Sequence, residues 1–299
     1  MRTYLDCIPC FVRQTLDSVR MTTADEQIHE KVLRRILSLA SKMDMRKSPP
    51  VMAQKIHRFI REITGVKDPY LEIKNRCNKL ALQMYPELTE QVKTASDPLE
   101  TSVRIAIAGN IIDFGVKSVV EHTQIETTIA QSLIKPLDME ALDRFRSATA
   151  EAENILYLGD NAGEIVFDRL LIEQLPYQKI TFVVKGSPIL NDATMEDAEI
   201  VGLTDIVDVI DNGSDAPGTI VEQCSAEFRE LFYESDLLIA KGQGNFETLC
   251  DSNRDSLFLL QPKCVVLARH LGCKIGSLVL FWSEAQAGVC IEEQLEERS

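Results

Sequence analysis

The chain of 299 residues carries 46 acidic and 32 basic side chains, a formal net charge of −14 at pH 7. This charge disfavours nucleic acid and anionic membranes as partners, because both need a basic surface, but a bound cation would still admit a small anionic substrate. The longest apolar stretch, residues 277–282, is far shorter than a membrane span of roughly 20 residues, and the first residues lack the apolar core of a signal peptide. We therefore expect a cytoplasmic protein with two domains, or one large domain with a helical appendage.

Cysteine usage does not indicate a disulfide framework. The eight cysteines are scattered, and only Cys7 and Cys10 form a C-x-x-C pair. A structural zinc site usually needs four ligands, and the sequence has no second C-x-x-C and no clustered histidines. Two interpretations stay open: reduced, half-buried thiols near a helix start, or a metal or redox role.

Residues 1–150 have the pattern of helices and no strong strand signal. Thr23-Ala-Asp-Glu26 is a possible capping box, Pro49 begins a helix that Gly65 ends, and Pro69 and Pro86 separate further helices. Apolar spacing predicts helices over residues 28–40, 49–65, 99–114 and 138–150. We predict an N-terminal all-helical domain over 1–150.

From residue 154 short apolar runs alternate with helical patterns. The predicted strands cover residues 155–158, 180–184, 206–210, 237–240 and 257–260, and helical patterns such as 165–175 and 220–231 lie between most of them. Strands that alternate with helices indicate βαβ units and a parallel sheet. We therefore predict an α/β domain over 151–299 with a doubly wound, Rossmann-like sheet that carries the functional site.

Polar residues follow each predicted strand, at the sheet edge where open parallel sheets bind ligands. Asp160 and Asn161 follow the first strand and Asp192 follows the second. Two carboxylates and an amide offer oxygen ligands, which suit Mg²⁺ or Mn²⁺. Asp160 could instead be only a helix N-cap, and Asp211-Asn212-Gly213 is better explained as a turn.

A glycine-bearing loop, Lys241-Gly242-Gln243-Gly244-Asn245, follows the fourth strand and begins a helix. Its glycines would let backbone amides approach an anion, and Lys241 would add a point charge for phosphate. The loop is not a Walker motif, and Gly159-Asp160-Asn161-Ala162-Gly163 is not a dinucleotide-binding motif.

Asn110 and Asp113 interrupt an apolar helical run in the first half of the chain. A buried amide and a buried acid need partners. They either contribute to the site or cap a helix end at Gly109 or Gly115 and tie helices together.

Taken together, these motifs resemble the damage-control phosphatases, and in particular their prokaryotic subfamily with an N-terminal C-x-x-C. The resemblance runs nearly end to end through Cys7-x-x-Cys10, Asp68-Pro-Tyr70 with Lys74, Gly109-Asn110-x-x-Asp113-Phe-Gly115, Gly159-Asp160-Asn161-Ala-Gly-Glu164, Asn191-Asp192-Ala-Thr194 and Lys241-Gly-x-Gly-Asn245. It implies a metal held by Asp160, Asn161 and Asp192. It also implies a substrate loop from Lys241 to Asn245, including Gly242 and Gly244, and a phosphate contact from Lys263.

The implied activity is metal-dependent hydrolysis of small phosphorylated metabolites, damaged or surplus, with Mn²⁺, Ni²⁺, Co²⁺ or Mg²⁺ as cofactor. Water would attack the phosphorus directly, or a carboxylate such as Asp160 would first form an acyl-phosphate. Two other functions stay open: an S-adenosylmethionine-dependent methyltransferase, and a non-catalytic metal- or nucleotide-binding protein. The sequence does not indicate the oligomeric state.

Overall fold

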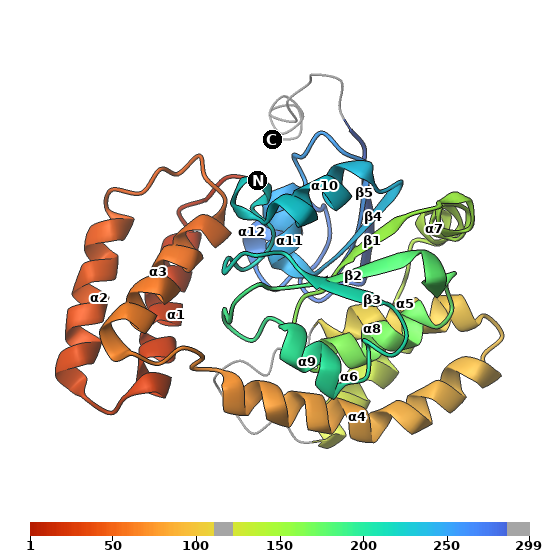
Figure 1. The fold of residues 1–299 in the computed structure, drawn as a ribbon, viewed down its shortest axis with the longest axis horizontal. Helices are drawn as coiled ribbons and strands as arrows, with labels where there is room; N and C mark the ends of the chain where they lie inside the picture. The colour runs from red at the N-terminus through yellow and green to blue at the C-terminus, as the bar shows by residue number, and fades with distance from the viewer. Residues whose placement is uncertain (111–121, 286–299) are drawn as a thin grey trace.

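The computed structural model describes residues 1–110 and 122–285. A six-stranded sheet lies between two layers of helices, and a three-helix bundle stands to one side of it (Figure 1). In the described part of the chain, no helix has both the length and the apolar character required to cross a membrane.

The bundle consists of α1 (Cys7–Thr22), α2 (Glu26–Ala40) and α3 (Pro49–Thr64), and it has a separate apolar core that includes Val32 and Ile56. Gly65 ends α3 in the left-handed region at φ 71°, as predicted. The predicted capping box at Thr23 is wrong. Asp25 is the N-cap of α2, because its carboxylate accepts a hydrogen bond from the backbone of Gln27.

Four helices follow the bundle: α4 (Leu71–Thr94), α5 (Pro98–Gly109), α6 (His122–Ile134) and α7 (Met139–Glu151). The expectation that Pro86 separates two helices is wrong, because α4 continues through it. Pro86 is exposed, so water can replace the hydrogen bond that proline removes.

The sheet has the strand order β3-β2-β1-β4-β5-β6. The strands are β1 (Ile155–Leu158), β2 (Ile180–Val184), β3 (Asp208–Asp211), β4 (Leu237–Lys241), β5 (Ser256–Leu260) and β6 (Val279–Ser283). The first five are parallel, which confirms the predicted α/β fold, although β3 begins two residues later than expected. The apolar stretch at 277–282 supplies β6, which pairs antiparallel with β5 and was not among the predicted strands.

Both faces of the sheet are covered. The helices between the strands are α8 (Glu164–Ile172), α9 (Met195–Ile200), α10 (Ala226–Glu234), α11 (Gly242–Leu249) and α12 (Val265–His270), with short 3₁₀ turns at Tyr177–Lys179 and Val221–Gln223. Alternate residues of β4 enter different cores. Leu237 and Ile239 pack with α5 and α8, whereas Leu238 and Ala240 pack with α10 and α11.

The core on the α5 and α8 side joins residues from both halves of the chain, including Val103 and Phe145 before residue 150 and Tyr157 and Phe167 after it. The secondary structure does change from helical to alternating near residue 150, but α4, α5 and α7 pack in the same core as the sheet. The division into domains at residue 150 stays a prediction.

Candidate functional site

The loops after β1 and β2 are joined by their backbones. Asn161 and Asp192 form an isolated antiparallel bridge. The amide of Ala193 donates to the carbonyl of Asp160 at 2.8 Å, and that of Ala162 donates to Asn191 at 2.8 Å. The structure therefore brings together Asp160, Asn161 and Asp192, as the strand-end argument predicts.

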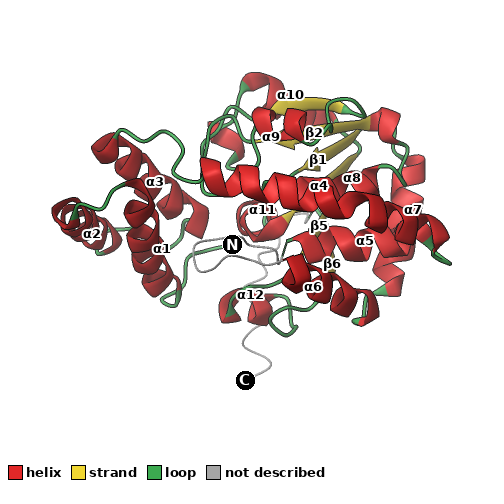
Figure 2. Cartoon of the chain, turned by 90° about the horizontal axis from the view of Figure 1, so that it is seen from below, coloured by secondary structure: helices red, strands yellow, loops and turns green. Residues whose placement is uncertain are grey.

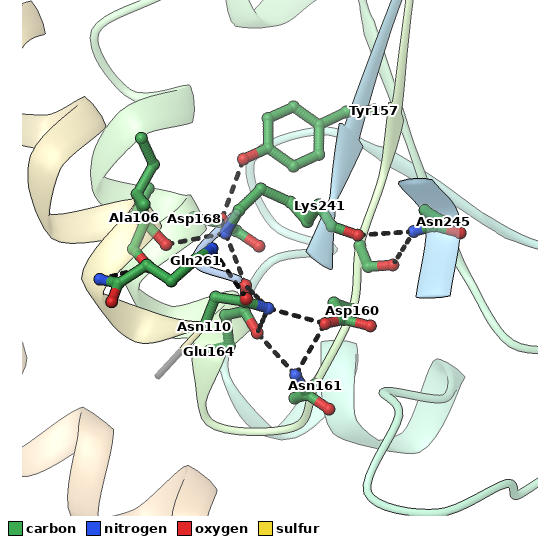
Figure 3. A network of polar contacts seen from close by, with 12 residues as sticks. Ala106, Asn110, Tyr157, Asp160, Asn161, Glu164, Asp168, Lys241, Asn245 and Gln261 are labelled. Atoms are coloured by element: carbon green, nitrogen blue, oxygen red, sulfur yellow. Dashed lines mark hydrogen bonds and ion pairs between the residues drawn. The ribbon is translucent and has the colours of Figure 1, made fainter. Parts of the chain in front are cut away.

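Hydrogen bonds fix the orientation of the Asp160 and Asn161 side chains (Figure 3). The Asn161 nitrogen Nδ2 donates to Oδ2 of Asp160 at 2.9 Å and to Oε2 of Glu164 at 2.8 Å. The Nδ2 of Asn110 also donates to Oδ2 of Asp160, at 2.8 Å. The Oδ1 atoms of Asp160 and Asn161 consequently point away from this network, which leaves one carboxylate oxygen and one amide oxygen for another ligand.

The electrostatic environment disfavours ionised acids in the bare protein. Burial, and then the nearby charges of Glu164 and Asp192, raise the pKa of Asp160 well above its ordinary value, with Lys263 and Lys185 opposing. Burial raises the pKa of Asp192 to about 6 against the opposing charge of Lys185. The oxygen Oδ2 of Asp192 lies 3.5 Å from the Lys185 ammonium and receives no hydrogen bond from residues within the described ranges. An added positive charge would therefore stabilise the ionised forms of Asp160 and Asp192.

Lys241 is completely buried and points into the layer between the sheet and α5 (Figure 3). Its ammonium donates to Glu164 at 2.7 Å, to Asp168 at 2.5 Å and to the carbonyl of Ala106 at 2.9 Å. Burial opposes the charge, but Asp168 and Glu164 raise the pKa of Lys241 above its ordinary value. Three acceptors thus already surround this ammonium, so its predicted contact with phosphate stays a prediction.

The rest of the loop after β4 is held against the loop after β1. Gly242 has φ 80°, and a Cβ there would stand 1.8 Å from Oδ2 of Asp160. Asn245 donates to the carbonyls of Gly159 at 3.2 Å and Lys241 at 2.8 Å. The loop is also tightly packed at Gly244, because a Cβ added at Gly218 would stand 2.2 Å from the Gly244 carbonyl oxygen. Asn245 therefore fixes the loop, and the predicted contacts of Gly242, Gly244 and Asn245 with substrate stay predictions.

Of the two remaining predicted site residues, Lys263 and Asp113, the structure describes only Lys263. Lys263 is exposed, its amide donates to Gln243 at 3.4 Å, and its charge acts on Asp160, which places it at the same sheet edge. Asp113 lies outside the described residues.

Sequence reasoning missed Glu164 and Asp168 as members of this site. Glu164 links Asn110 and Asn161 to Lys241, and Asp168 accepts from Lys241 and, at 2.9 Å, from the Tyr157 hydroxyl. The available signal was their spacing: two acids four residues apart share one face of a largely apolar helix.

The predicted metal ligands offer oxygen donors, which are the kind that a hard cation binds. Within residues 1–110 and 122–285, no three His, Cys, Asp or Glu side chains stand in a preformed metal-binding arrangement. Asp160, Asn161 and Asp192 instead supply two carboxylates and one amide oxygen, a combination that divalent cations accept together with water.

The strand order reverses between β1 and β4, and the buried acids and amides gather at this switch point. The molecule is thus a Rossmann-like α/β protein with a polar site at the carboxyl edge of its sheet. Residues 3–279 match the damage-control phosphatase ARMT1-like domain, so the chain belongs to that family. The resemblance inferred from the motifs is confirmed at this level, whereas the C-x-x-C subfamily stays a prediction.

The chain is similar to several archaeal proteins over almost its whole length. It is 35% identical to a damage-control phosphatase of Archaeoglobus fulgidus over 280 residues, which covers 91% of this chain and 96% of the relative. It is 37% identical to an uncharacterised protein of Methanocaldococcus jannaschii over 287 residues, 92% and 93% of the two chains. The crystal structure of a DUF89 family protein from Pyrococcus horikoshii superposes with a TM-score of 0.84 at 32% identity, covering 95% of this chain and 100% of the other.

Proposed function

We propose that the protein is a metal-dependent phosphomonoesterase that acts on small phosphorylated metabolites in the cytoplasm. Membership of a phosphatase family supports the reaction class. The observation that carries the metal dependence is the convergence of Asp160, Asn161 and Asp192, each with at least one oxygen that the hydrogen-bond network does not use.

The balance of buried charge supports a divalent cation at this position. Among residues 1–110 and 122–285, five buried carboxylates lie in the site or contact its residues, against three buried ammonium groups: Asp160, Glu164, Asp168, Asp192 and Asp197, with Lys74, Lys185 and Lys241. If all eight groups are ionised, two negative charges are unbalanced. One divalent cation would neutralise them, which is the condition under which buried acids stay ionised at neutral pH.

In this mechanism the protein residues bind and orient. Asp160, Asn161 and Asp192 hold the cation, which supplies Lewis acidity toward a phosphoryl oxygen when bound. Asn110 and Glu164 hold the Asp160 and Asn161 side chains in place, so that the Asp160 oxygen Oδ1 and the Asn161 oxygen would be available to a cation. Lys263, exposed at the same edge, draws the anionic phosphate toward the site and balances charge on the transferring phosphoryl group.

The test is hydrolysis of p-nitrophenyl phosphate and of a panel of sugar phosphates and nucleotides by the full chain. Activity should require Mn²⁺, Ni²⁺, Co²⁺ or Mg²⁺ and be abolished by a chelator. Asp160→Asn should lower turnover at least about 100-fold. Asp143→Asn, an exposed acid on α7, is the matched control and should leave turnover unchanged. Binding of S-adenosylmethionine without metal-stimulated hydrolysis would overturn the proposal in favour of a methyltransferase.

A further inference from the structure

Two buried polar side chains on α4, Lys74 and Asn78, lie one helical turn apart. They are 2% and 0% exposed. α4 runs beside α8 and α9 in the helical layer (Figure 1, Figure 2). These are the two helices that begin directly after the loops of Asp160 and Asp192, so this face of α4 meets both halves of the proposed metal site.

Both the oxygen and the nitrogen of the Asn78 side-chain amide form hydrogen bonds. Its oxygen accepts from the backbone amide of Gly163 at 2.6 Å, and its nitrogen donates to Oδ1 of Asp197 at 2.8 Å. Gly163 comes two residues after Asn161 and has φ 77°. A Cβ at Gly163 would stand 2.9 Å from that of Cys77, so the turn after β1 is pressed against α4. Asn78 therefore fixes the first loop to the start of α9.

Lys74 holds the other loop. Its ammonium lies 2.8 Å from Oδ2 of Asp197 and 3.3 Å from Oδ2 of Asp68. Asp197 in turn accepts from the amide of Thr194 at 2.9 Å and from its hydroxyl at 2.8 Å. Thr194 comes two residues after Asp192, so the position of Asp192 depends on the position of Asp197.

Asp197 is the shared partner, since Lys74 and Asn78 each bind one of its two oxygens. The distance between the loop of Asn161 and the loop of Asp192 is therefore set by a rigid helix as well as by the bridge between the loops. Mg²⁺ demands near-ideal octahedral geometry with ligands at about 2.1 Å, so a change in the separation of the two loops would weaken its binding.

We propose that Lys74 and Asn78 are positioning residues that fix the separation of Asp160 and Asn161 from Asp192, and so set the affinity of the site for its cation. The inference rests on the proposed metal-dependent function. It gives the family motif Asp68-Pro-Tyr70 with Lys74 a role, and it gives α4 a part in the site without a contact to substrate.

The experiment measures binding of Mn²⁺ alone to the full chain by calorimetric titration with MnCl₂ at constant temperature and without substrate. Asn78→Ala should raise the Mn²⁺ concentration that half-saturates the site, the Mn²⁺ midpoint, by about tenfold. Leu88→Ala, which removes buried apolar contacts from the same helix, is the matched control. It should lower the melting temperature while keeping the wild-type Mn²⁺ midpoint.

Lys74→Arg and Lys74→Met provide a second comparison. The arginine variant keeps a cation between Asp68 and Asp197 and should bind Mn²⁺ within about threefold of wild type, whereas the methionine variant should lose at least tenfold. If Lys74→Met does not fold, the Asn78 comparison decides. A wild-type midpoint in Asn78→Ala would overturn the inference while leaving the phosphatase proposal intact. Absence of any Mn²⁺ response in the wild-type chain would overturn both.

Discussion

The backbone of Gly242 approaches Asp160 so closely that a methyl group at position 242 would stand 1.8 Å from the carboxylate oxygen Oδ2. Gly242→Ala should therefore displace Asp160 and lower phosphatase activity at least tenfold. Gly65→Ala is the matched control, because Gly65 has a similar φ of 71° but a methyl group there would meet nothing within 4 Å. Both variants should lose roughly 1 kcal/mol of stability from backbone strain, but only Gly242→Ala should lose activity. Equal activities would show that Asp160 does not need its present position.

Asn110 tests whether the helical half of the chain takes part in the site. Its amide donates to Oδ2 of Asp160 at 2.8 Å, so Asn110→Ala should lower turnover at least tenfold by freeing the Asp160 carboxylate. Melting temperature and specific activity should be measured on the same preparation. A loss of about 1–3 kcal/mol in stability with normal turnover per folded molecule would instead make Asn110 a purely structural residue.

Lys241 and Lys263 should respond differently to the same substitution. Lys241→Met leaves Glu164 and Asp168 buried without their cation, so the free energy of unfolding should fall by about 3–5 kcal/mol. Lys263→Met removes an exposed charge, so it should raise KM while changing the free energy of unfolding by less than about 1 kcal/mol. Denaturant unfolding and steady-state kinetics on both variants check this. A raised KM with normal stability for Lys241→Met would favour direct phosphate binding by that residue.

The thiols of Cys7 and Cys10 should not take part in hydrolysis. Burial, together with nearby groups that include Glu247 and Cys264, raises the pKa of both thiols, which lowers the fraction of reactive thiolate. The double variant Cys7→Ser, Cys10→Ser should keep most of its turnover with Mn²⁺ as the added metal. A loss as large as that of Asp160→Asn, in a protein that is still folded, would contradict this prediction.

His57 should make the protein sensitive to acid. Burial, and then the charge of Arg61, lower the pKa of His57 from 6.5 to about 3 in the folded protein. Between these values the unfolded chain binds a proton that the folded chain does not, so stability falls as the pH decreases. Between pH 7 and pH 4.5 this costs roughly 2–3 kcal/mol.

Denaturant unfolding at these two pH values checks the effect. His57→Leu should lose that part of the pH dependence, whereas Leu88→Ala, which removes no titratable group, should retain it. An unchanged pH dependence in His57→Leu would mean that His57 takes up its proton over the same pH range in the folded and unfolded chains.

The parallel sheet could be predicted because its strands are short apolar runs buried on both faces, as in β1 and β5. The antiparallel β6 could not, because nothing in an isolated apolar run states its direction. Local signals also failed where two residues competed for one role. Thr23 and Asp25 are both good N-caps, and only the start of α2 at Glu26 shows that Asp25 is the one used.

Within the candidate site, the positions of Asp160, Asn161 and Asp192 followed from their places directly after predicted strands, whereas the direction of Lys241 did not. Lys241 is the third residue in the alternating series Leu237, Ile239, Lys241, so its side chain shares their face of the sheet and enters the core beside α8. The alternation of side chains along a strand predicts the face on which Lys241 lies, but only once β4 is known to extend to Lys241. The contacts of Asn110 with Asp160 depend on how α5 packs, 50 residues earlier in the chain, which no local pattern gives.

The ion pairs of Lys241 also affect how the chain folds. Glu164 and Asp168 are separated from Lys241 by 77 and 73 residues. In a partly folded form with β1 to β3 but without β4, α8 would have to keep these two acids hydrated or bury them protonated, so α8 docks favourably only when β4 is also in place. The Lys241 ion pairs therefore couple the central strands β1 and β4 to the helical layer, which favours one cooperative folding transition for the sheet over a stable first half.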